Sequence, residues 1–132
     1  MIERDGKLLL ERRTDAPVWS LIAGKVEDDE SLIEGLVREV AEETGLTVSG
    51  YSFFGHYSDP SRIVAYPDGN VFSVATFAYV VGVESFEGLR PSAESHELRF
   101  FSKADLHELD MPATQQEVIE HYRAGSTAPI LA

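Results

Sequence analysis

Hydrophobic and polar positions along the chain follow two different periods, which predict strands and helices in a mixed order. Apolar residues spaced three and four apart predict a helix over 31–44, and Pro112 opens a second helix that runs to about Arg123. Short runs rich in apolar, β-branched and aromatic residues predict strands at 7–12, 18–22, 46–57, 71–83 and 98–101. Because these elements do not alternate regularly, the pattern predicts an α+β fold, an α/β/α sandwich with a mixed β-sheet flanked by helices.

The helix at 31–44 has clear start and stop signals. Ser31 and Glu34 form the S-x-x-E pattern of a capping box, and Gly45 stands where a helix-terminating glycine belongs. Its apolar stripe consists of Leu32, Ile33, Leu36, Val37 and Val40. Between the later strands, the turn-forming residues of 66–70 predict a hairpin loop.

Length and composition restrict the class of protein. The 132 residues fit a single domain spanning 1–132, with no run of about 18 apolar residues that could cross a membrane. The charged N-terminus lacks the apolar core of a signal peptide, so we expect a cytoplasmic protein. There are no cysteines, which excludes disulfides and thiolate sites. The net charge of −12 argues against binding along a nucleic-acid backbone, and part of the acid is expected to bind a divalent cation.

The predicted helix presents three glutamates on one face. Glu39, Glu42 and Glu43 are spaced i, i+3 and i+4, and like charges at this spacing destabilise a bare helix. Their face lies roughly 110° from the centre of the apolar stripe, so it should flank the core. Carboxylate oxygens suit Mg²⁺ or Mn²⁺, and Arg38 and Glu30 can orient them by ion pairing. The alternative is an ordinary solvated acidic helix face.

Residues Gly24 to Leu46 resemble the Nudix box, the signature of the Nudix hydrolase family. Nine positions match at the family spacing: Gly24, Glu30, Arg38, Glu39, Val40, Glu42, Glu43, Gly45 and Leu46. The flanking segments also look alignable, so that the resemblance covers about 100 residues. It implies hydrolysis of a diphosphate linkage in a nucleoside diphosphate joined to a group X, with Mg²⁺ (or Mn²⁺) as the cofactor.

The resemblance also implies roles for individual residues. Metal ligands would be Glu39, Glu42 and Glu43, joined by Glu97 and by the backbone carbonyl of Ala23. Glu39 or Glu42 would be the first candidates for the general base, with Glu97 or Glu94 behind them, and Arg38 would belong to the catalytic group. Many relatives have glycine where this chain has Ala23, which would be strained if the loop required a positive φ.

Contacts to the substrate are expected from cationic and aromatic residues. Arg12 and Arg13 could donate to phosphates, Trp19 and Tyr57 could stack on a base, and Arg62 lies in a loop that could border the substrate. The substrate could be ADP-ribose or another nucleotide sugar, or a nucleoside triphosphate in a sanitising role. A different class of function is a catalytically silent Nudix-fold module that binds a nucleotide.

The first strand suggests an assembly. Relatives usually have a further strand before Lys7, and we expect this chain to be too short to contain all of it. Because Leu8, Leu9 and Leu10 are consecutive, an uncovered strand there would be an apolar sheet edge. We therefore expect a possible homodimer that covers this edge, unless Met1 to Arg4 or the C-terminal residues of the same chain cover it.

Overall fold

The computed structural model describes residues 1–14, 18–93 and 95–132, which form two main sheets, a separate hairpin and three helices. One sheet contains β1 (Glu3–Arg4), β2 (Lys7–Arg13), β3 (Trp19–Leu21) and β8 (Ser95–Phe101). The other contains β4 (Val48–Tyr57), β7 (Thr76–Val83) and β9 (Ile130–Leu131), and β5 (Ile63–Ala65) pairs with β6 (Val71–Ser73). The helices are α1 (Leu32–Thr44), α2 (Lys103–Leu106) and α3 (Ala113–Ala124).

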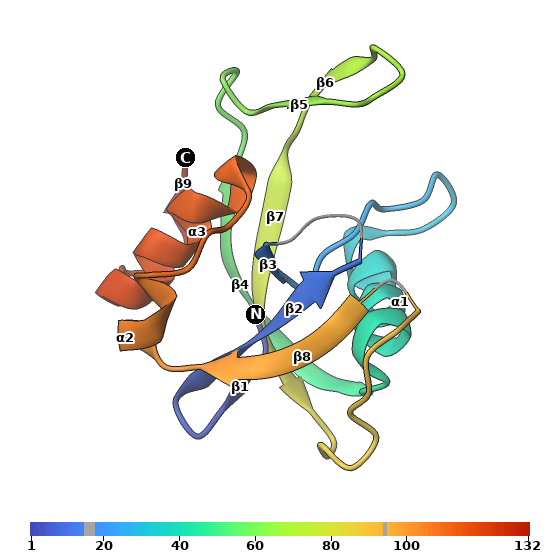
Figure 1. Cartoon of the computed structure of the whole chain (residues 1–132), viewed down its shortest axis with the longest axis vertical. Helices are drawn as coiled ribbons and strands as arrows, with labels where there is room; N and C mark the ends of the chain where they lie inside the picture. The colour runs from blue at the N-terminus through green and yellow to red at the C-terminus, as the bar shows by residue number, and fades with distance from the viewer. Residues whose placement is uncertain (15–17, 94) are drawn as a thin grey trace.

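Helices lie on both sides of the sheets, as Figure 1 shows for α1 on one side and for α2 and α3 on the other. Each side has its own apolar core. Val40 of α1 packs in a core with Leu9 and Val81, whereas Val118 of α3 packs in a second core with Leu8. The predicted α+β fold with flanking helices is therefore confirmed.

Helix α1 begins and ends where the sequence predicts. The Ser31 side chain accepts a hydrogen bond from the Glu34 backbone N–H at 3.1 Å, and the Glu34 carboxylate accepts one from the Ser31 backbone N–H at 3.1 Å. Gly45 adopts a left-handed conformation with φ of 76°, as a helix-terminating glycine should. A Cβ on this residue would also lie 2.5 Å from the Gly88 carbonyl oxygen, so the close approach favours glycine a second time.

Strand β2 is a central strand, and the expectation of an exposed edge is wrong. It pairs with β1 and β3 along one side and with β8 along the other. The Leu9 backbone N–H donates to the Ile2 carbonyl at 2.9 Å, so the first residues of the chain take the place expected for a partner. Consecutive leucines suit this position because both faces of β2 are covered. Because β2 has no uncovered edge, it gives no basis for a homodimer at this strand.

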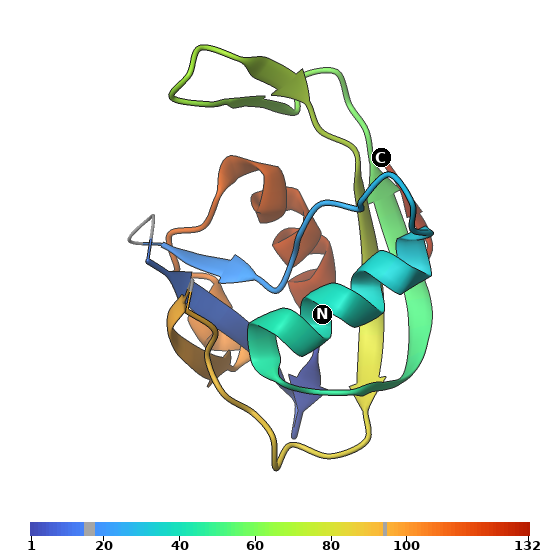
Figure 2. The ribbon, with the colours of Figure 1, turned by 90° about the vertical axis from the view of Figure 1, so that its right-hand side faces the viewer.

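The predicted long buried strand over 71–83 is also wrong, because it divides into β6 and β7. Residues 71–73 belong to the β5–β6 hairpin, which extends beyond the ends of β4 and β7 (Figure 2). Val71 and Phe72 are exposed there, and only β7 continues through the main sheet. The predicted hairpin loop is confirmed, since the Tyr66 N–H donates to the Asn70 carbonyl at 2.8 Å.

Candidate functional site

Arg38 is the centre of an ion-pair network at the start of the box. Its Nε and Nη2 atoms donate to Glu30 at 3.0 and 2.6 Å, and Nη1 donates to Glu39 at 2.8 Å and to Glu42 at 3.2 Å. Nη2 also donates to the Lys25 carbonyl at 3.0 Å. The hydrogen bond from Arg38, followed by one from the Glu27 backbone, lowers the pKa of Glu30. The predicted ion pairing of Arg38 with these glutamates is present, and it joins α1 to the preceding loop.

Gly24 lies against the carboxylate of Glu39. A Cβ built on Gly24 would lie 2.0 Å from Glu39 Cδ and 2.1 Å from Oε1. A side chain at position 24 would therefore force the Glu39 carboxylate out of its present position. The first and fourth of the nine box positions are therefore in direct contact.

Glu43 is buried beside a second acidic residue, Glu11 of β2. Glu43 is only 5% exposed and Glu11 is fully buried. Burial, followed by the hydrogen bond and the charge of Glu11, raises the pKa of Glu43 to about 8, and Arg13 opposes the shift. Among the described residues, Glu43 Oε2 has no hydrogen-bond partner. Burying a carboxylate oxygen without a partner is costly, so this position favours a proton or a cation.

Sequence reasoning did not identify Glu11 as part of the site. Its Oε2 accepts a hydrogen bond from Ser95 Oγ at 2.8 Å, and its Oε1 lies 3.3 Å from Arg13 Nη1. One signal was available in the sequence. Glu11 stands two residues after Leu9, so the two side chains must face the same side of β2. That side carries the α1 core, and a glutamate directed towards it is unusual.

The three box glutamates differ in their surroundings. Glu43 is buried, the Glu39 side chain is 17% exposed, and the Glu42 side chain is 59% exposed. The acidic face therefore runs from the core to solvent, as its predicted flanking position requires. Within residues 1–14, 18–93 and 95–132, no three acidic or histidine side chains converge into a ready-made metal cage. Arg38 holds Glu39 and Glu42, which leaves the unpartnered oxygen of Glu43 as the feature that fits a hard cation best.

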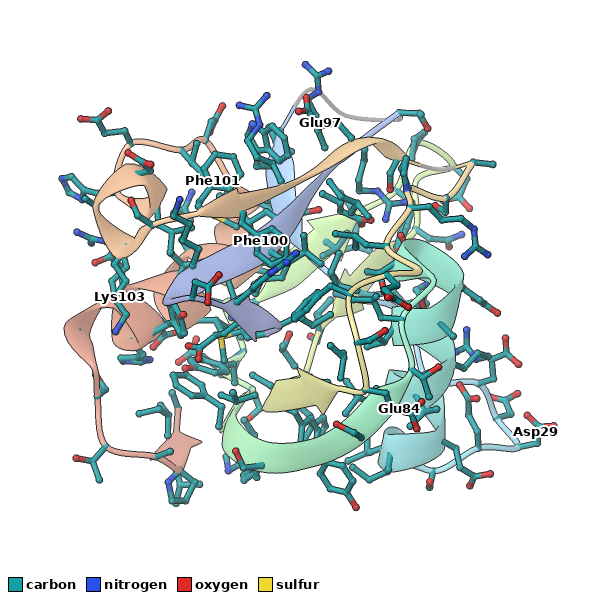
Figure 3. All side chains as sticks on the ribbon, turned by 90° about the horizontal axis from the view of Figure 1, so that it is seen from below. Asp29, Glu84, Glu97, Phe100, Phe101 and Lys103 are labelled. Carbon is teal, nitrogen blue, oxygen red and sulfur yellow. The ribbon has the colours of Figure 1, made fainter. Side chains whose placement is uncertain are left out.

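Glu97 lies on the other face of the first sheet and does not meet the box glutamates. It pairs across the strands with Arg12, at 3.4 Å between Oε1 and Nη2, and Arg99 Nη2 donates to its Oε2 at 2.7 Å. Figure 3 shows Glu97 near one end of β8, with Phe100 and Phe101 further along the strand. The core beneath α2 and α3 contains Phe101, and Trp19, whose ring lies under Arg12, packs against this core. Strand alternation directs Glu97 away from α1, so the structure does not bring it together with Glu39 and Glu43, and its role as a ligand stays a prediction.

The expected substrate-binding residues also separate. Arg13 lies on the side of Glu11 and Glu43, whereas Arg12 lies over the Trp19 ring at 5.9 Å on the opposite face. Trp19 is half-buried, with Arg99 over its ring at 5.2 Å and Phe101 packed edge-on at 4.8 Å. Of these two arginines, Arg13 is therefore the one that lies on the side of the box glutamates.

Tyr57 and Arg62, two of the expected substrate-binding residues, are both buried in this structure. Tyr57 is fully buried in the core beneath α3, and its hydroxyl lies 2.9 Å from His121 Nδ1. Arg62 is also buried, and its Nη2 donates to Thr76 Oγ1 and to the Thr114 carbonyl, both at 2.7 Å. Both residues hold the β4–β7 end of the sheet against α3, and a contact of either one with the substrate stays a prediction.

Two further expectations concern the loop residues. Ala23 is exposed and has no positive φ, since Asp5 is the only non-glycine residue of the described chain with one. The expected strain of alanine at this position is therefore absent, and its carbonyl remains a predicted ligand. Glu94 lies outside the described residues.

Across the part of the chain that the structure describes, no helix is both long and apolar enough to span a membrane.

Comparison with known proteins places this geometry in a family. A NUDIX domain model matches residues 1–122. The chain is 37% identical over 122 residues to an ADP-ribose pyrophosphatase from Methanocaldococcus jannaschii, covering 90% of this chain and 66% of that protein. It is 49% identical over 57 residues to a CTP pyrophosphohydrolase from Escherichia coli, covering 39% of this chain and 42% of that protein. The chain therefore spans less than two thirds of each of these relatives.

Solved structures show the same fold. The fold superposes on a MutT structure, from a study of Aliivibrio salmonicida and Vibrio cholerae, with a TM-score of 0.75 at 21% identity, covering 95% of this chain and 91% of that chain. It also superposes on the NUDIX domain of Shewanella oneidensis NrtR complexed with ADP ribose, with a TM-score of 0.65 at 20% identity, covering 94% and 81%. Together with the box geometry, the match over residues 1–122 shows that the chain belongs to the Nudix hydrolase family.

Proposed function

We propose that this protein is a Mg²⁺-dependent hydrolase of the diphosphate linkage in a nucleoside diphosphate-X, with ADP-ribose as the first substrate to test. The observation that carries the proposal is the buried, unpartnered oxygen of Glu43 at the end of an intact box. A buried anionic oxygen without a donor suits a cation. The similarity to the Methanocaldococcus jannaschii ADP-ribose pyrophosphatase supports the choice of substrate.

The residues of this chain have distinct roles in the proposed reaction. Glu43, Glu39 and Glu42 would hold the metal, with the Ala23 carbonyl as a further ligand. When bound, Mg²⁺ supplies charge neutralisation at the phosphates and lowers the pKa of the attacking water. Arg38 orients Glu39 and Glu42 through its two ion pairs, and Arg13 donates to a phosphate oxygen. Glu42 is the more exposed of the two candidate bases, so it is the better placed to take a proton from water.

A second candidate is hydrolysis of nucleoside triphosphates. The local identity of 49% to the Escherichia coli CTP pyrophosphohydrolase favours it, although that match covers only 57 residues. A third is a silent nucleotide-binding module, for which the NrtR domain complexed with ADP ribose is the comparison. The second product distinguishes the two reactions. A nucleoside diphosphate-X gives a nucleoside monophosphate and phosphoryl-X, whereas a triphosphate gives a nucleoside monophosphate and pyrophosphate. A silent module gives no product.

The test is turnover of ADP-ribose, a second nucleotide sugar, CTP and dGTP after chelation and again after Mg²⁺ is restored. We expect cleavage of ADP-ribose with Mg²⁺ and none without it. Glu42→Gln should reduce turnover about 100-fold or more, whereas Glu108→Gln, an exposed site with the same change of charge, should not. Binding of ADP-ribose without cleavage of any substrate would support the silent module and reject the enzyme.

A further inference from the structure

Glu11 and Glu43 form a pair of buried carboxylates that joins a strand to the box helix. Glu11 has no exposed surface, and Glu43 has 5%. Glu11 lies close enough to Glu43 for its side chain and its charge to raise the Glu43 pKa, and Glu43 Oε2 has no hydrogen-bond partner among the described residues. Two adjacent carboxylates repel one another in a buried setting, and the free oxygen has no donor to compensate it. Arg13 partners Glu11, so the position that still lacks a positive partner is Glu43 Oε2.

The contacts of Glu11 distinguish its role from that of Glu43. Ser95 Oγ donates to Glu11 Oε2 at 2.8 Å, and Arg13 Nη1 lies 3.3 Å from Oε1. Both of its oxygens are thus occupied by residues of β8 and β2. These contacts fix the Glu11 carboxylate on the rigid central strand, so that it can act on Glu43 without being a ligand itself.

We propose that Glu11 is a positioning residue for the cation of the box: it holds Glu43 in place and adds the negative charge that makes a divalent cation bind tightly. The inference rests on the proposed function, since it assumes that Glu43 is a ligand. Groups that orient metal ligands typically change metal affinity by about 10- to 100-fold when they are removed. Glu11 occupies that position here because it is buried beside Glu43 on the strand that faces α1.

A purely structural role for Glu11 predicts a different result. If Glu11 only accepted hydrogen bonds from Ser95 and Arg13, its replacement would reduce stability and leave metal affinity unchanged. If it positions Glu43, replacement by an uncharged side chain of the same shape would weaken metal binding. The amide of a glutamine could also donate to Glu43 Oε2, which stabilises the empty site in competition with the metal.

The experiment measures Mn²⁺ binding directly, by titration calorimetry and by the spin-resonance signal of free Mn²⁺. Wild type, Glu11→Gln and Glu108→Gln are compared, and melting after chelation checks that each variant is folded. We expect the dissociation constant of Glu11→Gln to increase about 10-fold or more, while the metal-free variant melts at or above the wild-type temperature. Glu108→Gln, which makes the same change of charge on an exposed loop, should bind Mn²⁺ as the wild type does.

Each outcome separates this inference from the proposed function. Equal dissociation constants for wild type and Glu11→Gln would overturn the positioning role while leaving the enzyme assignment intact. Failure of the wild type itself to bind Mn²⁺ would reject both. Should Glu11→Gln not fold, Glu11→Asp is measured, which keeps the charge and withdraws the carboxylate by one methylene. Weaker binding by that variant supports positioning, and unchanged binding rejects it.

Discussion

At the scale of single residues, Gly24 leaves room for the Glu39 carboxylate because it has no Cβ. We predict that Gly24→Ala reduces Mg²⁺ affinity and turnover by about 10-fold or more, because the new Cβ would lie 2.0 Å from Glu39 Cδ and displace the carboxylate. Stability should change little, since Gly24 has no positive φ and is exposed. Gly50→Ala is the matched control, because a Cβ there meets nothing within 4 Å. Full activity of Gly24→Ala would show that Glu39 does not need this position.

Glu43 predicts a pH dependence in the metal-free protein. Its pKa in the folded state is raised from 4.5 to about 8, mainly by burial and then by Glu11. Between these values the folded state binds more protons than the unfolded state, so that stability falls as the pH rises from about 5 to about 8. Denaturant titrations with a chelator present should show this fall in the wild type and a smaller one in Glu43→Gln. Parallel curves for the two proteins would contradict the raised pKa.

Some site residues could be assigned from the sequence and others could not. Glu30, Arg38 and Glu39 could be assigned because their spacing within one helix and its preceding loop is local. Glu11 and Glu97 could not, because the face that each presents depends on the pairing of β2 with β8, strands more than 80 residues apart in the chain. The LLLERR sequence does not show which side of the strand α1 covers, because leucines stand on both of its faces.

At the scale of elements, Arg62 joins the base of the β5–β6 hairpin to the start of α3. We predict that Arg62→Leu lowers the free energy of unfolding by about 2 to 4 kcal/mol, because the carbonyls of Val74 and Thr114 lose their donor in a buried setting. The Michaelis constant of the folded fraction should not change. Arg123→Leu, which removes an i,i+3 pair on α3 and an exposed hydrogen bond to the Lys103 carbonyl, should cost less, about 1 kcal/mol. A stable Arg62→Leu with weakened substrate binding would restore the role in binding that its sequence position suggested.

Elements with local signals were predictable and elements defined by distant pairing were not. Helix α1 was predicted to within a residue because its capping box and its terminal glycine are encoded in its own sequence. The division between β6 and β7 was missed because 71–83 is apolar throughout, although part of it projects beyond the main sheet. The exposure of Val71 and Phe72 follows from tertiary position, which hydrophobicity does not report.

For the whole molecule, β2 is shared by both cores. Leu8 and Leu10 belong to the core under α3, and Leu9 belongs to the core under α1. We predict that Leu9→Glu abolishes folding, because a buried charge and a lost apolar contact cost several kcal/mol against a total stability of about 5 to 15 kcal/mol. Circular dichroism of the purified variant tests this, with Leu131→Glu at an exposed position as the control. A folded Leu9→Glu that had merely changed its oligomeric state would revive the interface originally expected at this strand.

The β5–β6 hairpin has a consequence for motion on the timescale of seconds to hours. A two-stranded hairpin is marginally stable alone, whereas β2 is paired on both edges and covered on both faces. Amide hydrogens of 63–73 should therefore exchange with deuterium through local opening, and those of β2 only through global unfolding. Lys25 Nζ lies 4.9 Å from the Tyr66 ring and 5.8 Å from the Phe72 ring, so the hairpin touches the residue next to Gly24. Ligand binding at the box should therefore slow exchange in the hairpin, where mass spectrometry can detect occupancy without any turnover.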